Sequence, residues 1–318
     1  MIFPTPSGTR DVLPEEMREL RAISERLLGV FTDAGYGEIY TPAIEYEDVL
    51  QLGATGVDPA YRVFDERGNV LALRQDMTVP IARVAATRYE GVEPPFRFCY
   101  MAHSYRAVQP HRGQMREFLQ AGVELIGAPA PEGTAETLTM IARSLDAIGL
   151  ADYSIALGSS ALLGALLRGF GVDDERHAPV LQELAMRDFV SLGQALLDLG
   201  LSPKDERFIA DILQTRGGPE VLSDLPGEAE QSVLGLRQVY ERLSEDVAGR
   251  IVFDLGLNRG LGYYTGAIFE VLHPSLGAPI GGGGRYDDLL ARFGRDLPAV
   301  GFALGVDMVH LAIAGQEQ

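Results

Sequence analysis

Polar side chains in the first half of the sequence recur at spacings that suit the binding of a small zwitterion. Gln120, Gly122 and Glu124 alternate in a strand-like run, so they should share one face of a strand. The glycine between the amide and the carboxylate leaves room for a small polar ligand. Asp76 and Thr78 have the same two-residue spacing, and an acid beside a hydroxyl group is a good receptor for an ammonium group.

One arginine and two tyrosines would complete such a site. Arg106 lies on a strand-like run that precedes the strand of Glu124, and its guanidinium group could bind a carboxylate with two parallel hydrogen bonds. Tyr263 and Tyr264 could form the wall around a ligand side chain. Each of these residues alone is explained as well by a surface ion pair or by ordinary packing. Their combination predicts an amino-acid pocket.

The run of four glycines at Gly281–Gly284 has a more restricted meaning. Alone it indicates a tight turn or a close approach of two backbones, because glycine has no Cβ atom. It is not a phosphate-binding loop, since no Gly-Lys-Ser or Gly-Lys-Thr sequence follows it. The single cysteine, Cys99, excludes an internal disulfide and any zinc site made of cysteines alone. We therefore expect neither a metal nor a resident cofactor.

The elements that must position these residues divide the chain into three parts. The first part holds an amphipathic helix over Glu15–Phe31, a second over Thr134–Gly149 and short strands between them. Those strands are expected at Glu38–Tyr40, Arg62–Phe64, Val70–Leu73, Arg97–Tyr105 and Glu117–Ile126, with a further one at Tyr153–Leu157. A helical period then dominates from about Ser159 to Ala248, and strand patterns return at Ile251–Leu255, Gly266–Leu272 and Ala299–Leu304.

This order predicts an α+β fold with a mostly antiparallel sheet flanked by helices and an inserted all-helical subdomain. Residues 1–158 and 249–318 would form one discontinuous core, and residues 159–248 would form the insertion. We find no repeat and no low-complexity segment. The helices of the insertion are expected at Ala161–Phe170, Ala178–Arg187, Val190–Leu199, Lys204–Leu213 and Ala229–Leu243.

Composition narrows the class of partner. The 318 residues carry a net charge of −18 and only one lysine, Lys204, although arginines cluster around Arg106–Arg116. Nucleic-acid binding relies on Lys and Arg that displace counterions, so the charge argues moderately against RNA as a partner. The N-terminus lacks the pattern of a signal peptide, and no apolar run approaches the length needed to cross a bilayer. We expect a protein of the cytoplasm.

Taken in order, the motifs resemble the catalytic core of histidyl-tRNA synthetase, a class II aminoacyl-tRNA synthetase. The resemblance extends over nearly the whole chain. It rests on the opening Pro6–Asp11, a motif 1 at Gly35–Glu45, a motif 2 at Phe98–Glu124, two histidine-specific signatures at Arg259–Gly266 and Gly281–Asp287, and the start of motif 3 at Pro298–Gly305. Class II motif 1 implies a homodimer.

The departures from that family concern the groups that grip ATP. Motif 3 of the synthetases continues into Glu-Arg, where this chain has Asp307-Met308, and a carboxylate facing a triphosphate would repel it. In the motif 2 loop Val108-Gln109 replaces Glu-Arg and Gln114 replaces an arginine, while Gly262 replaces an acid of the first signature. The chain also continues only to Gln318 after motif 3, so we expect no anticodon-binding domain.

The positions that contact histidine in the synthetases are kept. The resemblance assigns histidine binding to Asp76, Thr78, Arg106, Gln120, Glu124, Arg259, Tyr263, Tyr264 and Tyr286. A pocket without the ATP grip is similar to that of the regulatory subunits of short-form ATP phosphoribosyltransferase, the first enzyme of histidine biosynthesis. This second resemblance implies no catalytic residue, a hetero-oligomer with short catalytic subunits, and L-histidine as the ligand for feedback inhibition.

Two other interpretations remain open at this point. The chain could be a truncated enzyme that still forms histidyl-adenylate, because Arg106, Arg112, Arg116 and Arg259 could neutralise phosphate charge. It could also be a scaffold whose pocket is vestigial. Binding of ATP through these arginines would favour the enzyme, and failure to bind any amino acid would favour the scaffold.

Overall fold

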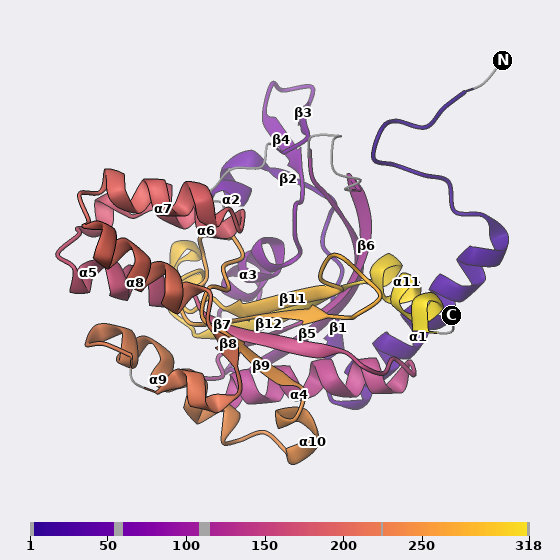
Figure 1. Ribbon diagram of the computed structural model, residues 1–318. Helices are drawn as coiled ribbons and strands as arrows, with labels where there is room; N and C mark the ends of the chain where they lie inside the picture. Colours follow the sequence, from indigo (N-terminus) through magenta and orange to yellow (C-terminus); the bar gives the residue numbers. More distant parts are fainter. Residues whose placement is uncertain (1–2, 54–59, 108–114, 224, 317–318) are drawn as a thin grey trace.

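A computed structural model describes residues 3–53, 60–107, 115–223 and 225–316, and its main element is one large mixed sheet (Figure 1). The strands of this sheet are β1 (Gly37–Glu38), β5 (Phe96–Tyr105), β6 (Glu117–Ile126), β7 (Ser154–Ser159), β8 (Arg216–Gly217), β9 (Ile251–Asp254), β10 (Ala267–Leu272), β11 (Gly281–Arg285) and β12 (Ala299–Gly305). Their order is β1-β5-β6-β12-β11-β10-β7-β9-β8. All neighbours are antiparallel except β1 with β5 and β7 with β9. The predicted α+β fold is confirmed.

Three long helices cover one face of this sheet. They are α1 (Pro14–Asp33), α4 (Glu132–Ala147) and α11 (Val306–Gln316), and each contacts at least one of the central strands β5, β6 and β12. The apolar residues of α1 recur at helical spacing, so Leu20, Ile23, Leu27 and Phe31 all point into the core. Phe31 packs edge-on against Phe302 of β12, with ring centroids 5.9 Å apart.

The other face of the sheet carries a smaller layer and the candidate site. The strands β2 (Ile44–Tyr46), β3 (Arg62–Phe64) and β4 (Val70–Leu73) form a separate sheet in the order β2-β4-β3. The helices α2 (Glu47–Gln51) and α3 (Thr78–Thr87) follow β2 and β4 in the chain, and α3 contacts β6 and the 3₁₀ helix η4 (Leu290–Phe293). Met77, Ile81, Phe98 and Tyr100 belong to the second apolar core formed here.

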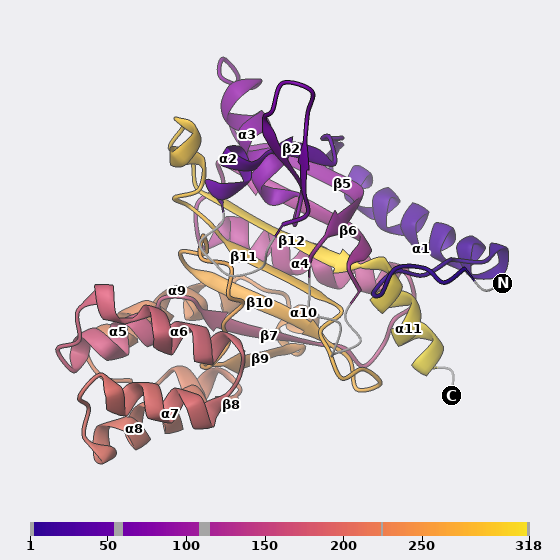
Figure 2. The ribbon, with the colours of Figure 1, turned by 90° about the horizontal axis from the view of Figure 1, so that it is seen from above.

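A group of helices occupies the end of the sheet near β7, β8 and β9, opposite α1 and both chain termini (Figure 2). We call it the helical segment: α5 (Leu162–Gly169), η2 (Asp174–Arg176), α6 (Ala178–Ala185), α7 (Phe189–Asp198), α8 (Pro203–Leu213), η3 (Pro219–Leu222), α9 (Glu228–Tyr240) and α10 (Glu245–Ala248). Side-chain caps start two of these helices, with Asp188 accepting hydrogen bonds from the first turn of α7 and Ser202 from that of α8. The two-residue strand β8 interrupts the helices and pairs with β9.

No helix in the described part of the chain is long and apolar enough to cross a membrane.

Candidate functional site

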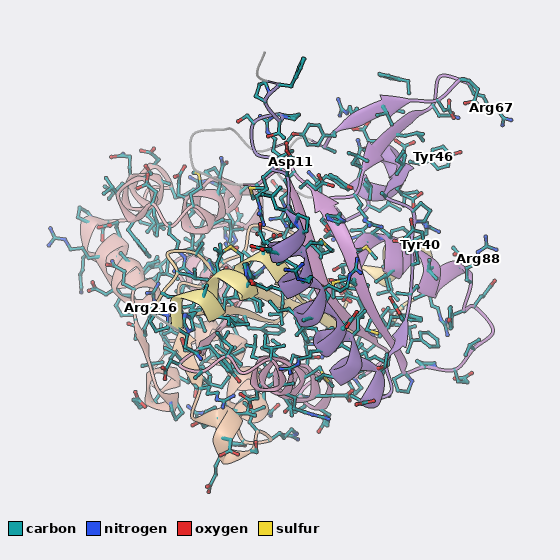
Figure 3. All side chains as sticks on the ribbon, turned by 90° about the vertical axis from the view of Figure 1, so that its right-hand side faces the viewer. Asp11, Tyr40, Tyr46, Arg67, Arg88 and Arg216 are labelled. Carbon is teal, nitrogen blue, oxygen red and sulfur yellow. The ribbon has the colours of Figure 1, made fainter. Side chains whose placement is uncertain are left out.

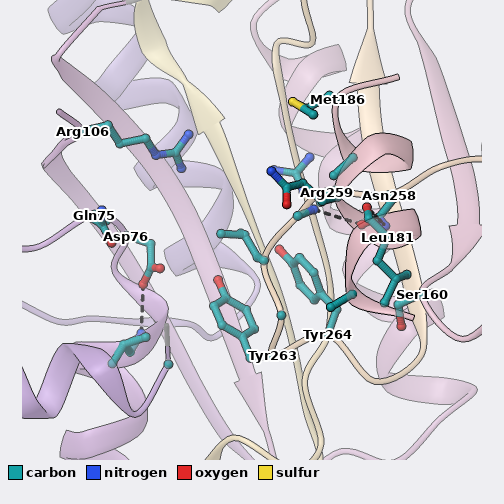
Figure 4. A pocket seen from close by; sticks show the side chains of 18 of the residues that line it. Gln75, Asp76, Arg106, Ser160, Leu181, Met186, Asn258, Arg259, Tyr263 and Tyr264 are labelled. Carbon is teal, nitrogen blue, oxygen red and sulfur yellow. Dashed lines mark hydrogen bonds between the residues drawn. The ribbon is translucent and has the colours of Figure 1, made fainter. Parts of the chain in front are cut away.

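A pocket of about 690 Å³ lies between the sheet, the 258–264 loop and α6. Gln75, Asp76 and Arg106 border it on one side, and Asn258, Arg259 and Met186 border it on the other (Figure 4). The rings of Tyr263 and Tyr264 lie between the two sides, with their centroids 5.0 Å apart. A cavity of this size with a few convergent polar groups is typical of a small-molecule site.

The strand register explains how distant residues meet beneath this pocket. Glu124 of β6 lies opposite Gly301 of β12, which lies opposite Gly284 of β11. Two residues along, Gly122 lies opposite Ala303, and Ala303 opposite Gly282. Because side chains alternate along a strand, these two rows face the same side of the sheet. The expected alternation of Gln120, Gly122 and Glu124 is therefore confirmed, since all three lie on β6.

The glycines of β11 make room for the pocket residues. A Cβ atom on Gly282 would lie 2.0 Å from an Nη atom of Arg259, and one on Gly284 would lie 2.9 Å from the ring of Tyr264. On the opposite face, a Cβ on Gly283 would meet a backbone oxygen at 1.9 Å. The glycine run is thus the central strand of the sheet. The sequence allowed either a tight turn or a close approach of two backbones here, and the structure shows the close approach.

Glu124 is the most deeply buried acid beneath the pocket, with 1% of its surface exposed. Thr78 donates a hydrogen bond of 2.8 Å to its Oε1 atom, and the hydroxyl of Tyr286 donates to its Oε2 atom. Burial raises the pKa of Glu124 to about 8, with a further contribution from the nearby Asp76 and partial compensation by the two hydrogen bonds. At neutral pH this side chain is therefore mainly an uncharged acid.

Asp76 lies just before the start of α3. Its Oδ1 atom accepts a hydrogen bond of 3.0 Å from the backbone N–H of Val79, as helix-capping acids do, and Thr78 is the first residue of the helix. Asp76 and Thr78 are thus close because a helix begins there. Burial raises the pKa of Asp76, while the Val79 N–H, the charge of Arg106 and a hydrogen bond with Tyr263 favour its ionised form.

Arg106 and Arg259 bring positive charge to the two sides of the pocket (Figure 4). The guanidinium group of Arg106 lies 5.1 Å from the ring centroid of Phe118. One Nη atom of Arg259 lies 3.4 Å from Oε1 of Glu270 and 3.4 Å from the carbonyl oxygen of Phe269. Its Nε atom is buried and has no hydrogen-bond partner among the described residues. A ligand with a carboxylate could accept that bond.

The nine residues predicted for the site fall into three groups. The first group lines the pocket: Asp76, Arg106, Arg259, Tyr263 and Tyr264. Thr78, Glu124 and Tyr286 form the hydrogen-bonded layer beneath it. Gln120 lies on β6 in the same row as Gly305, and its Oε1 atom is buried without a partner in the described part of the chain.

The sequence did not reveal the wall made by the helical segment. Leu181, Gln182 and Met186 line the pocket from α6 and the turn after it, and Asn258 donates a hydrogen bond of 3.3 Å to the carbonyl oxygen of Leu181. A helical pattern alone cannot distinguish residues that pack against a neighbour from residues that face a cavity. No signal in the sequence would have selected these positions.

Asp307, which the sequence predicts to face a triphosphate in a nucleotide-bound state, forms an ion pair with the N-terminal segment. Its Oδ1 atom lies 2.7 Å from a guanidinium nitrogen of Arg10, which also pairs with Glu16. Because one guanidinium group is shared by the two carboxylates of Glu16 and Asp307, this cluster still carries one net negative charge. Met308 still supplies no cation where the synthetases have an arginine. The replaced positions Val108, Gln109 and Gln114, as well as Arg112, lie outside the described residues.

Comparisons with known proteins agree on one family. The histidyl-tRNA synthetase family matches residues 8–309. The ATP phosphoribosyltransferase regulatory subunit of Desulforamulus reducens is 39% identical over 312 residues, covering 96% of this chain and 78% of that protein. The protein of the same name from Symbiobacterium thermophilum is 40% identical over 321 residues, covering 98% of this chain and 80% of its own.

Solved structures give the same answer. A structure described as an ATP phosphoribosyltransferase regulatory subunit/histidyl-tRNA synthetase from Bacillus halodurans matches with a TM-score of 0.89 and 30% identity, covering 98% of this chain and 83% of that one. Histidyl-tRNA synthetase from Nostoc, at 24% identity and a TM-score of 0.82 over 99% of this chain and 76% of that one, shares the fold. The chain therefore belongs to the ATP phosphoribosyltransferase regulatory subunits, which are built on the fold of histidyl-tRNA synthetase.

Proposed function

We propose that this protein binds the short catalytic subunit of ATP phosphoribosyltransferase, supports its activity and senses L-histidine. The complex would be a glycosyltransferase that joins ATP to phosphoribosyl pyrophosphate, and this chain would contribute no catalytic residue. Family membership is the observation that carries the proposal. The absence of the motif 3 arginine at Met308 supports a role other than adenylate formation.

Histidine suits the charges of the pocket. An α-ammonium group would lie near Asp76, whose carboxylate is half-buried at the start of α3. A carboxylate would lie between the guanidinium groups of Arg106 and Arg259, and the Nε atom of Arg259 would gain the acceptor it lacks among the described residues. The aromatic rings of Tyr263 and Tyr264 would pack against the imidazole.

The uncharged layer beneath the pocket supports the same ligand. A protonated Glu124, held by Thr78 and Tyr286, adds no net negative charge below the two arginines. We expect Glu124→Ala to weaken histidine binding at least about tenfold, because two buried hydroxyl groups would lose their shared acceptor. Isothermal titration calorimetry would measure the change, and an unchanged affinity would remove Glu124 from the site.

We also propose a homodimer within the hetero-oligomer. Tyr40, Ile44, Tyr46 and Phe64 are exposed on or beside the three-stranded sheet, with 83% of Tyr40 and 72% of Phe64 accessible. Ile44 and Tyr46 lie on the same face of β2, because the half-buried residue between them, Glu45, points the other way. Tyr40 and Tyr46 project from one side of the molecule (Figure 3). An apolar surface of this kind, in the region that resembles motif 1, suits a second copy of the chain.

Reconstitution with a short catalytic subunit tests the proposal. The purified chain should co-elute with that subunit, increase its rate of forming phosphoribosyl-ATP, and make that rate sensitive to histidine. An Asp76→Asn variant should still co-elute and activate, but histidine should inhibit its complex more weakly. If the wild-type chain neither binds nor activates the catalytic subunit, the proposal is wrong.

A separate measurement addresses the alternative of an adenylate-forming enzyme. The folded chain should show no histidine-dependent exchange between ATP and pyrophosphate, because Met308 cannot replace the arginine that grips ATP. Clear exchange would mean that other arginines, such as Arg106 and Arg116, hold the nucleotide. That result would favour the synthetase-like enzyme.

A further inference from the structure

Glu270 stands between an arginine of the pocket and an arginine of the helical segment. Its Oε1 atom lies 3.4 Å from Arg259, and its Oε2 atom lies 3.1 Å from Arg187. The side chain of Glu270 is only 13% exposed. A carboxylate that is largely removed from water and divided between two cations responds to the loss or displacement of either one.

Arg187 occupies the turn that joins α6 to α7. The same guanidinium nitrogen lies 3.9 Å from Asp254, a buried acid of β9 that also pairs with Arg216 at 2.9 Å. Arg187 therefore joins the helical segment to two acids of the sheet. The residues just before it, Met186 and Ala185, line the pocket itself. A shift of this turn would consequently move a wall of the pocket.

We propose that Glu270 positions Arg259 for a ligand carboxylate. Arg187 competes with Arg259 for the charge of Glu270 and thereby sets how strongly Arg259 attracts that carboxylate. When a carboxylate binds Arg259, the bond between Arg259 and Glu270 weakens and Glu270 turns its charge toward Arg187. The turn between α6 and α7 is then held more tightly against the sheet. The position of the helical segment thereby depends on whether a ligand occupies the pocket. This inference rests on the ligand proposed above.

The sign of the effect follows from the local charges. With Arg187 in place, the negative charge of Glu270 is shared, so Arg259 keeps positive potential for the ligand. Without Arg187, Glu270 pairs with Arg259 alone and opposes an incoming carboxylate. Coupling between two sites is reciprocal. If the contact between Arg187 and Glu270 increases the affinity for the ligand, then binding of the ligand must stabilise that contact to the same extent.

The test compares L-histidine with L-histidinol, in which an alcohol replaces the carboxylate. We expect Arg187→Gln to weaken histidine binding about threefold to tenfold, as measured by calorimetry, because Arg187 is partly exposed and its charge is partly screened. Binding of histidinol should change less than about twofold, since the effect acts through the carboxylate. Arg187→Lys, which keeps the charge, should recover part of the preference for histidine.

A matched control is Arg168→Gln. Arg168 also belongs to the helical segment and also bridges two acids, Asp174 and Glu228, with similar exposure, but it contacts neither Glu270 nor Arg259 in the described structure. This variant should bind both ligands as the wild type does. Hydrogen exchange gives a second readout: histidine should protect α6 and the following turn in the wild type and in Arg168→Gln, but not in Arg187→Gln.

The outcomes separate this inference from the proposed function. If the wild type binds histidine but Arg187→Gln changes histidine and histidinol affinity equally, Arg187 has only a structural role and the inference is wrong. It is equally wrong if neither affinity changes. If the wild type binds neither compound, the proposed ligand is wrong and the inference fails with it.

Discussion

The ionisation of the buried Glu124 should lower the free energy of unfolding of this protein as the pH rises toward 8 and above. Its carboxyl group has a pKa of about 8 in the folded state, against an ordinary value of 4.5. For an acid whose pKa is raised by folding, the folded state binds more protons than the unfolded state between these two pKa values. The contribution of this acid to the stability is therefore fully present below the unfolded-state pKa and is lost as the pH rises through the folded-state pKa. At about 1.4 kcal/mol per pKa unit, full ionisation costs the folded state about 5 kcal/mol.

The substitution Glu124→Gln isolates this effect, because glutamine has the same shape and does not ionise. Between about pH 5.5 and about pH 8.5 the wild type should lose about 3 kcal/mol of unfolding free energy relative to the variant. Urea unfolding of both proteins across this range would measure the difference, in which the titration of most other groups cancels. The amide of the variant can still accept the hydrogen bond from Thr78.

Glu117→Gln serves as the control for the loss of one formal charge, since Glu117 lies on the same strand but is exposed. Glu117 takes no part in the hydrogen-bonded layer beneath the pocket, so this variant should not reproduce the effect of Glu124→Gln. Parallel stability curves for the wild type and Glu124→Gln would refute the reasoning. They would mean that Glu124 is already ionised at low pH, and that water or a cation reaches it beneath the pocket.

Other substitutions test the packing of the fold. Arg97→Ala should lower the free energy of unfolding by about 1 kcal/mol, because Arg97 and Glu136 form two parallel hydrogen bonds but are each about one-third exposed. Urea unfolding would measure this loss, and an unchanged free energy of unfolding would show that solvent screens the pair fully. Gly301→Ala should destabilise the protein by at least about 2 kcal/mol, because its Cβ would lie 1.9 Å from a carboxylate oxygen of Glu124 and 2.6 Å from a backbone oxygen; a thermal midpoint equal to that of the wild type would contradict the close packing. Phe64→Asp should convert the proposed dimer to a monomer in light scattering with little change in melting temperature, since Phe64 is 72% exposed; a wild-type monomer would exclude the dimer.

Local patterns predicted most of the elements of the fold. The helix expected at Glu15–Phe31 spans Pro14–Asp33, and the strands expected at Arg62–Phe64 and Val70–Leu73 have those bounds. The helix shows a clear period of about 3.6, which its one buried face imposes. The pairing of the strands could not be predicted from the sequence, because β6 pairs with β12, which follows it by more than half of the chain length. Sequence periodicity carries no information about such long-range partners.

The site was predictable in its residues but not in its construction. Asp76 and Thr78 were selected for their two-residue spacing and their chemistry, and no element was predicted for them; they lie at the start of a helix. A spacing of two residues occurs both at helix starts and along strands, so it gives no element for this pair. Leu181 and Met186 were missed because a residue that faces a cavity looks like one that faces a core. Whether all nine predicted residues contact histidine remains a prediction.

The glycine strand β11 also has a consequence for the order in which this protein folds. Gly281–Gly284 carry no side chain that prefers an extended conformation, and glycine loses more backbone entropy on ordering than other residues do. The strand therefore has little tendency to form alone, and it depends on hydrogen bonds from β10 on one side and β12 on the other. Because it is the central link of the sheet, we expect the two halves of the sheet to join late in folding and the floor beneath Arg259 and Tyr264 to be completed at that step.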